Sequence, residues 1–116
     1  MKENTKARIL YWKEIPAQVQ AEDNNGKISY PLASRFQEGI DKIAMLDGSH
    51  NSETYLDGWV WGEYSAVEGT AEEAAVRLAD RYNEGFPNDF VNKIKKLQVN
   101  GERRPYPGAV DEWISE

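Results

Sequence analysis

The sequence predicts an α+β fold: a small, mostly antiparallel sheet of three N-terminal strands plus one Trp-rich strand, with two or three helices packed on one face. Three observations carry this prediction. Strand-forming residues with a turn between them fill the N-terminal part, helical spacing of apolar residues begins after residue 31, and a second aromatic stretch separates the helices. The 116 residues suit a single domain, with a loose N-terminus at 1–6, a strand-rich part at 7–67 and a helical part with a Pro-rich tail at 68–116.

The first strand is expected at residues 7–12, a run rich in strand-forming side chains. Alternate side chains of a strand point to opposite faces, so Ile9 and Tyr11 share one face while Leu10 and Trp12 share the other. Because both faces carry bulk, we expect this strand to lie inside the sheet or to be covered on both sides.

A β-hairpin is predicted at residues 17–30. Pro16, just before it, has no N–H donor and marks an edge, a bulge or a turn. The run Asp23-Asn24-Asn25-Gly26 is a strong turn signal because Asn and Gly tolerate positive φ angles. Residues 27–30 then return as the third strand.

The first helix is expected to begin near Ser34, which forms a capping-box pattern with Gln37, and to end at Asp47-Gly48. Its apolar residues recur at helical spacing. These residues are Leu32, Phe36, Ile40, Ile43 and Ala44. The polar residues 49–53 are typical of a loop.

A Trp-rich strand is expected within residues 54–67, with Trp59 and Trp61 on one face. Gly58 and Gly62 flank these residues and indicate a bulge or a close approach of two backbones.

Two further helices follow. Thr70 and Glu73 form a capping-box pattern that opens a helix ending at Gly85, and Pro87 suits the first turn of a short third helix. The tail contains Trp113, which we expect to dock back on the domain.

Composition excludes several classes of function. The net charge of −6 argues against a nucleic-acid or anionic-membrane partner, because both select basic surfaces. Neither a signal peptide nor a run of about 20 apolar residues is evident, so a cytoplasmic location is the default. With no Cys, the chain has no disulfides, thiolate metal ligands or Cys nucleophile. The basic clusters around Lys95 and at Arg103-Arg104 are expected to be solvated.

No residue pattern points to a cofactor, a metal or a catalytic centre, so the chain is not expected to be an enzyme. Asp47, His50 and Glu53 lie close together, but one imidazole without a second His or a Cys is a weak signal for a metal site. We interpret them as a solvated acidic loop.

A family resemblance comes from short motifs in a fixed order. The motifs are Arg8-Ile9-Leu10-Tyr11-Trp12, Ile15-Pro16-Ala17-Gln18-Val19, Leu32, Arg35-Phe36-Gln37, Ile40-Asp41, Ala44-Met45 and Tyr55-Leu56-Asp57-Gly58-Trp59. Over residues 8–64 the chain resembles the small bacterial "virulence factor" domain family, which is also similar to the middle part of conserved virulence factor C-type proteins. There the domain accompanies a NifU-like segment and HEAT-like repeats. The resemblance implies a bacterial module that binds a partner, and it supplies no catalytic residue.

The first functional hypothesis is therefore a non-enzymatic protein–protein interaction module. Aromatic residues and Arg carry most of the binding energy in typical interfaces. The candidate binding residues are Arg8, Tyr11, Trp12, Gln18, Arg35, Asp41, Trp59 and Trp61. Replacing Trp59 or Arg35 by Ala is expected to weaken partner capture without unfolding the domain.

Two rival hypotheses stay open. In the first, the chain binds an anionic small molecule or is a modest enzyme, with Arg35 holding the anion and Asp41 or Tyr11 acting as acid or base in a shared pocket. In the second, it is a structural domain that associates with itself.

Overall fold

The computed structural model describes residues 4–115, so the N-terminal residues 1–3 fall outside the description. The strands are β1 (Thr5–Trp12), β2 (Ile15–Asp23), β3 (Gly26–Pro31), β4 (Trp59–Trp61) and β5 (Ser65–Val67). The helices are α1 (Ser34–Leu46), α2 (Glu53–Asp57), α3 (Ala71–Gly85) and α4 (Phe90–Asn100), followed by a 3₁₀ turn, η1 (Asp111–Trp113). The fold is α+β, as predicted. Residues 5 and 6, expected to be loose, belong to β1.

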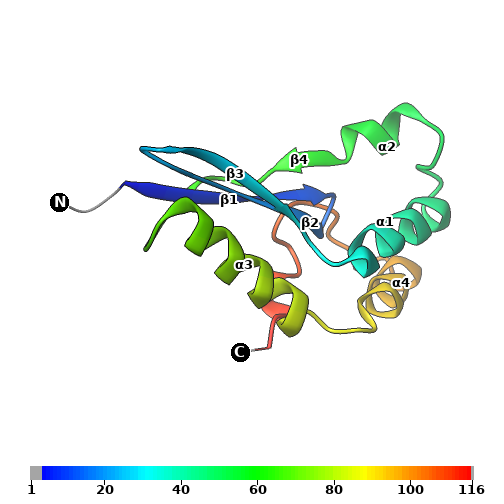
Figure 1. Cartoon of the computed structure of the whole chain (residues 1–116). Coiled ribbons are helices and arrows are strands. Elements are labelled where there is room, and N and C mark those ends of the chain that lie inside the picture. The colour runs from blue at the N-terminus through cyan, green and yellow to red at the C-terminus, as the bar shows by residue number, and fades with distance from the viewer. Residues whose placement is uncertain (1–3, 116) are drawn as a thin grey trace.

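The strands form a five-stranded antiparallel sheet with the order β3-β2-β1-β4 (Figure 1). The fifth strand, β5, pairs with the first residues of β1, whereas β4 pairs with its last residues. The inner position predicted for β1 is confirmed. The β2–β3 hairpin closes at the pair Asp23 and Gly26, as its turn residues predict. Between β1 and β2 the register moves from Leu10–Gln18 to Tyr11–Pro16, so the irregularity lies beside the proline.

One face of the sheet, here called the inner face, packs against α3 (Figure 1). Ile9 and Val19 are cross-strand partners on it, and both are buried. The facing side of α3 is built from alanines, including the fully buried Ala74 and Ala75. Small side chains let the helix lie close to the strands, and burial of the apolar strand residues stabilises each contact by roughly 1.5–3 kcal/mol per large side chain.

The helices α1 and α4 pack against each other at one end of the sheet (Figure 1). An aromatic group joins them: the ring centroid of Phe36 is 5.5 Å from that of Phe86 and 5.6 Å from that of Phe90. Gly39 faces the Phe90 ring, and a Cβ there would overlap it. Glycine at this position therefore allows the close approach of α4 to α1.

Local capping signals had different outcomes. The Thr70–Glu73 capping box at the start of α3 is confirmed, with both of its hydrogen bonds present. The box predicted for Ser34 is wrong, because Ala33 occupies the N-cap of α1 without a side-chain cap bond. Instead, the Ala33 N–H donates to Asn83 Oδ1 on α3, 2.8 Å away. A tertiary contact thus holds the start of α1, where no side-chain cap forms.

The segment between α1 and β4 also differs from the prediction. Residues 53–57, expected to be loop and strand, form the short helix α2. The Trp12 indole N–H donates to the Tyr55 carbonyl at 2.8 Å and fixes this helix to the sheet. A Cβ at Gly58 would lie 2.6 Å from Trp12 Nε1, so the close neighbour of this glycine is a side chain rather than the backbone that was predicted. The third predicted helix, α4, begins at Phe90 rather than near Pro87.

The C-terminal tail docks on the domain, as predicted from Trp113. Its ring centroid lies 6.2 Å from that of Phe86, and the Ser115 N–H donates to the Gly85 carbonyl at 2.9 Å. The prediction of a solvated Arg103 is wrong: its side chain is only 5% exposed and donates two hydrogen bonds to the fully buried Glu14. Within residues 4–115, no helix has the length and apolar character needed to cross a membrane.

Candidate functional site on the outer face of the sheet

The face of the sheet opposite α3, here called the outer face, carries no layer of helices among residues 4–115; α2 lies near one corner of it and the start of α1 meets its margin (Figure 1). Strand alternation and register decide which side chains point outward. Apart from the buried cross-strand pair Trp12 and Ile15, the outward strand positions are half-buried or exposed. They are Lys6, Arg8, Leu10, Gln18, Gln20, Glu22, Lys27, Ser29, Pro31, Trp59, Trp61 and Ala66.

An arginine held between two aromatic rings lies near the centre of the outer face. The Arg8 guanidinium carbon is 4.1 Å from the Trp61 ring centroid and 4.4 Å from the Tyr64 ring centroid. The Arg8 Nε–H donates to Gln20 Oε1 at 2.8 Å, and the Tyr64 hydroxyl donates to the same oxygen at 3.1 Å. Such stacking is favourable because the ring faces carry negative potential. The guanidinium plane is therefore fixed from several sides.

Two of the three cations at the outward strand positions, Lys6 and Arg8, are not neutralised by carboxylates of residues 4–115. The Lys6 ammonium lies 4.5 Å from the Tyr64 ring centroid. Among residues 4–115, neither Lys6 nor Arg8 forms a salt bridge. Lys27 does so, with Glu22 at 3.9 Å. Two aromatic-supported positive charges thus face outward.

A hollow of about 310 Å³ lies next along β1 from Arg8, at Leu10, where the outer face meets the start of α1. Leu10, Gln18 and Trp59 line its sheet side, and Gln37 lines its helix side. The Trp59 ring stands edge-on to Tyr55, with centroids 6.2 Å apart. The hollow therefore combines an apolar floor with amide groups at its margin.

Four predicted site residues come together on the outer face: Arg8, Gln18, Trp59 and Trp61. A fifth, Asp41, lies at its margin. Asp41 is exposed on α1 and accepts a hydrogen bond at 3.1 Å from Gln37, which lines the Trp59 hollow.

Tyr11 and Trp12 lie in the core instead. Trp12 is fully buried and shapes the outer face indirectly through its hydrogen bond to α2. Tyr11 is on the inner face, and its hydroxyl donates to Asp111 Oδ2 at 2.6 Å. Burial, together with the neighbouring Tyr82 and Asp111, raises the pKa of Tyr11 far above its ordinary value, so the hydroxyl stays protonated.

Arg35 joins α1 to the C-terminal end of α3. Its guanidinium donates to the carbonyl oxygens of Asn83, Phe86 and Pro87 at 2.9–3.1 Å and lies 4.5 Å from the Phe36 ring centroid. Burial lowers the pKa of Arg35 from its ordinary value. Because three backbone acceptors occupy it, this side chain serves the packing of helices and lies away from the outer face.

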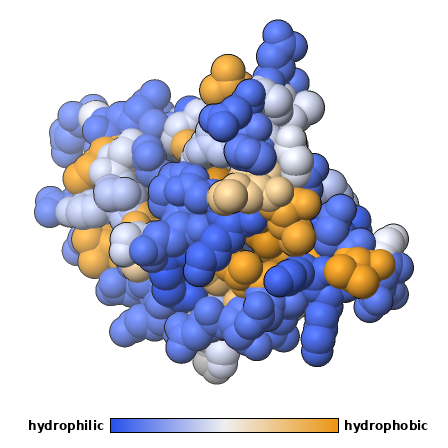
Figure 2. Space-filling view, turned by 90° about the vertical axis from the view of Figure 1, so that its right-hand side faces the viewer, coloured by the Kyte–Doolittle hydropathy of each residue, from blue (hydrophilic) through white to orange (hydrophobic). Residues whose placement is uncertain are grey.

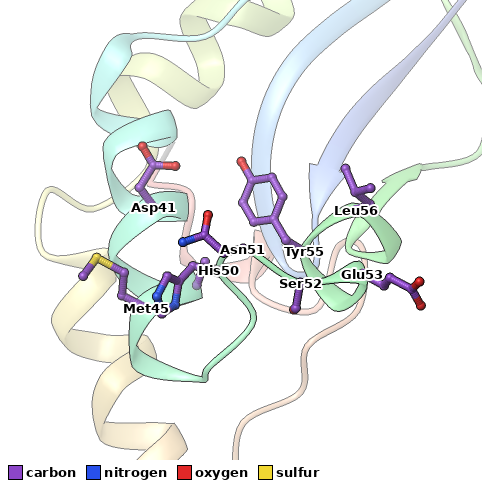
Figure 3. Close-up of a pocket in the computed structure, with 9 residues that line it drawn as sticks. Asp41, Met45, His50, Asn51, Ser52, Glu53, Tyr55 and Leu56 are labelled. Carbon is purple, nitrogen blue, oxygen red and sulfur yellow. The ribbon is translucent and has the colours of Figure 1, made fainter.

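A second hollow, of about 750 Å³, lies between α1 and α2. Asp41 and Met45 on α1 stand across it from Tyr55 and Leu56 on α2, with His50 on the connecting loop (Figure 3). Met45 is 66% exposed and Leu56 69%. Apolar side chains gather among hydrophilic ones on this side of the molecule (Figure 2). Within residues 4–115, no three or more His, Cys, Asp or Glu side chains are grouped so that they could hold a metal ion.

A third hollow, of about 620 Å³, is bounded by β1, the β4–β5 connection, α3 and the tail. Tyr11 and Tyr82 both donate to Asp111 Oδ2 there, at 2.6 and 2.8 Å. Burial and the nearby Asp111 carboxylate raise the pKa of Tyr82. Asp111 Oδ1 is buried and has no hydrogen-bond partner in the described part of the chain.

The small-molecule hypothesis needs Arg35 in one pocket with either Asp41 or Tyr11. In the part of the chain that the structure describes, Arg35, Asp41 and Tyr11 line three different hollows.

Sequence reasoning missed three outer-face residues: Lys6, Gln20 and Tyr64. The two-residue period of a strand, counted from Arg8 and Gln18, identifies the first two. Tyr64 lies between β4 and β5, and no local pattern predicts its position over Arg8.

Comparison with known proteins agrees with the motif resemblance. A family model described as "Virulence factor" matches residues 10–98, well over half of the chain, so the chain belongs to this family. The match extends beyond the motifs at 8–64 into α3 and α4. No curated protein and no solved structure matches the chain.

Proposed function

We propose that this member of the Virulence factor family is a non-enzymatic protein-binding domain of the bacterial cytoplasm, and that its outer face is the docking surface. One observation carries the proposal: Trp59, Trp61 and Arg8 lie half-buried together on the face of the sheet that α3 leaves uncovered. Trp and Arg are the residues most enriched among those that dominate binding energy at protein interfaces.

The rigidity of this surface also supports the proposal. Binding costs free energy when mobile side chains become ordered, by roughly 0.5–1.5 kcal/mol for each rotamer-rich side chain. Arg8 is already held by Trp61, Tyr64 and Gln20. Trp59 is already packed against Tyr55. A partner would therefore meet an ordered surface and lose less conformational entropy on docking.

The ionisable groups with the most perturbed pKa values support binding rather than catalysis. Tyr11 and Tyr82 have raised pKa values, but both donate their hydroxyls to Asp111 and tie the tail to the core. They point away from the outer face.

Site-specific photocrosslinking tests the proposal in two steps. A benzophenone amino acid replaces Trp61 on the outer face or Val76, which is 41% exposed on α3, as the matched control. We expect one dominant protein adduct from position 61 that is absent from position 76. The purified partner should then bind the full chain, and Trp59→Ala should weaken its Kd about 30-fold, the size of a hot-spot loss.

A circular dichroism melt shows whether Trp59→Ala keeps the fold, and Val76→Ala is the binding control. Equal adducts from both positions, or an unchanged Kd for a folded Trp59→Ala variant, would mean that the docking surface lies elsewhere.

A second candidate function, the binding of a small molecule, is supported by the unpartnered Asp111 Oδ1 beside the third hollow. A buried acceptor without a donor is costly, and a ligand hydroxyl or ammonium group could satisfy it after a small side-chain movement. A thermal-shift screen of polar metabolites tests this function. A true ligand should raise the Tm of the natural chain and leave the Tm of Asp111→Asn unchanged.

A further inference from the structure

Resting on the proposed function, we infer that the outer face binds an extended acidic segment of its protein partner. In this arrangement a carboxylate of the segment pairs with Arg8. An apolar side chain two positions along the segment enters the hollow beside Trp59.

The distribution of charge on the molecule supports an acidic segment. The chain as a whole has a net charge of −6. The outward strand positions carry the opposite balance, with Lys6, Arg8 and Lys27 against the single carboxylate of Glu22. Glu22 is already shared with Lys27. The outer face is thus a positive area on a negative protein, complementary to a partner's carboxylates.

The geometry of Arg8 selects a planar anion. Its Nε–H is bonded to Gln20, and Trp61 and Tyr64 hold its plane. Within residues 4–115, its terminal nitrogens have no hydrogen-bond partner. A guanidinium presents parallel N–H groups that match the two oxygens of a carboxylate. Arg8 is therefore ordered and able to accept a carboxylate from another chain.

The distance between the two proposed contacts suggests an extended segment. Leu10 is the next outward residue of β1 after Arg8, and it lines the Trp59 hollow. Two residues of a strand span about 7 Å. Positions i and i+2 of an extended peptide have the same separation and point to the same side. An acidic–x–apolar sequence would thus place its carboxylate over Arg8 and its apolar side chain in the hollow.

A single-stranded nucleic acid could also use aromatic rings and cations, but the observations favour a peptide. Nucleic-acid affinity grows with the number of phosphates neutralised. The outward positions offer only Lys6 and Arg8 free of salt bridges within residues 4–115, on a protein whose net charge of −6 repels a polyanion.

Binding of defined peptides to the full chain tests the inference. The probe is a fluorescent heptapeptide, Gly-Ser-Glu-Ala-Leu-Ser-Gly. The matched controls carry Gln in place of Glu or Ser in place of Leu, and a 12-nucleotide thymidine strand is included. Fluorescence polarisation should show binding of the Glu-Ala-Leu peptide that weakens with added salt. Losing the carboxylate, or the Arg8→Gln substitution, should weaken binding about tenfold or more.

Three outcomes would overturn the inference: no binding of the Glu-Ala-Leu peptide, equal binding of the Glu and Gln peptides, or tighter Arg8-dependent binding of the thymidine strand. The affinity of each variant for the crosslinked partner shows whether this inference alone has failed or the proposed function has failed as well. If Trp59→Ala weakens partner binding and Arg8→Gln does not, the docking surface stands and the acidic segment is wrong. If neither substitution weakens it, both proposals fail.

Discussion

Two arginines differ in what surrounds their charge: Arg103 in the tail is paired with carboxylates, and Arg8 on the outer face is stacked on aromatic rings. Arg103 is 5% exposed and donates to both oxygens of Glu14 at 2.7 and 2.8 Å, and also to Asp47 at 2.9 Å. Arg8 is half-buried between aromatic rings and has no carboxylate partner within residues 4–115. The first charge is neutralised inside the chain and fixes the tail. The second is positioned but left available to another molecule.

The ion cluster around Arg103 explains why a carboxylate is tolerated in the core. Glu14, at the β1–β2 turn, is fully buried, and a buried charge is costly unless it is paired and hydrogen-bonded. Asp47 completes the cluster by accepting from Lys13 at 2.7 Å and from Ser49. The cluster joins the turn, the end of α1 and the tail, so its loss would affect the whole fold.

The largest expected effect is that of Arg103→Ala. The substitution leaves the Glu14 carboxylate buried without its cation, and breaking such a pair by removing one partner costs about 3–5 kcal/mol. Urea unfolding followed by tryptophan fluorescence measures the loss in the free energy of unfolding. The matched control is Arg104→Ala, whose partner Glu112 lies 3.2 Å away at the surface. The control should be indistinguishable from the natural chain. Equal losses in both variants would contradict the structural role of the cluster.

The second expected effect is a pH dependence that comes from Asp47. Burial alone would raise the pKa of Asp47, but hydrogen bonds from Lys13, Ser49 and Arg103 outweigh it and lower the pKa to about 2. A folded-state pKa below the unfolded value means that the stabilisation is present above the unfolded pKa and is lost as the pH falls. The stability difference between the natural chain and Asp47→Asn should therefore be constant near pH 6 and shrink between about pH 4 and pH 2.

Urea unfolding of both proteins at a series of pH values measures this difference. A difference that stays the same from pH 6 to pH 2 would show that the ion cluster does not hold Asp47 in its charged form.

The parts of the fold that could be predicted are those with local causes. The turn at residues 23–26 and the Thr70–Glu73 box depend on neighbouring residues, and both formed as expected. The helix α2 has five residues and is fixed by Trp12, more than 40 positions earlier in the chain. A pattern of neighbouring residues cannot predict a contact between positions so far apart. The predicted cap at Ser34 did not form; the N–H of the N-cap residue Ala33 donates instead to Asn83, 50 positions later in the chain.

The candidate site was predictable to the extent that strand alternation determines it. Alternation places Arg8 and Gln18 on one face and Tyr11 on the other, while the burial of Trp12 depends on α2. The pairing of Glu14 with Arg103 spans 89 positions, and charge composition alone suggested a solvated arginine instead. Which charges are satisfied inside the chain is a property of the tertiary structure.

The smallest expected effect on stability is that of Arg8→Ala. Cation–π contacts of this kind at exposed sites contribute roughly 0.5–1 kcal/mol, and the substitution leaves no buried charge behind. We therefore expect a loss in the free energy of unfolding of no more than about 1 kcal/mol, measured by the same urea experiment. Lys27→Ala, on the exposed β3, is the matched control for removing a cation from this face.

A loss as large as that of Arg103→Ala would remove the distinction between the two arginines, because it would mean that the stacking of Arg8 on Trp61 and Tyr64 stabilises the fold. A small loss in stability together with a large loss in partner affinity would sharpen the distinction, since a side chain that contributes little to the fold would then contribute mainly to binding.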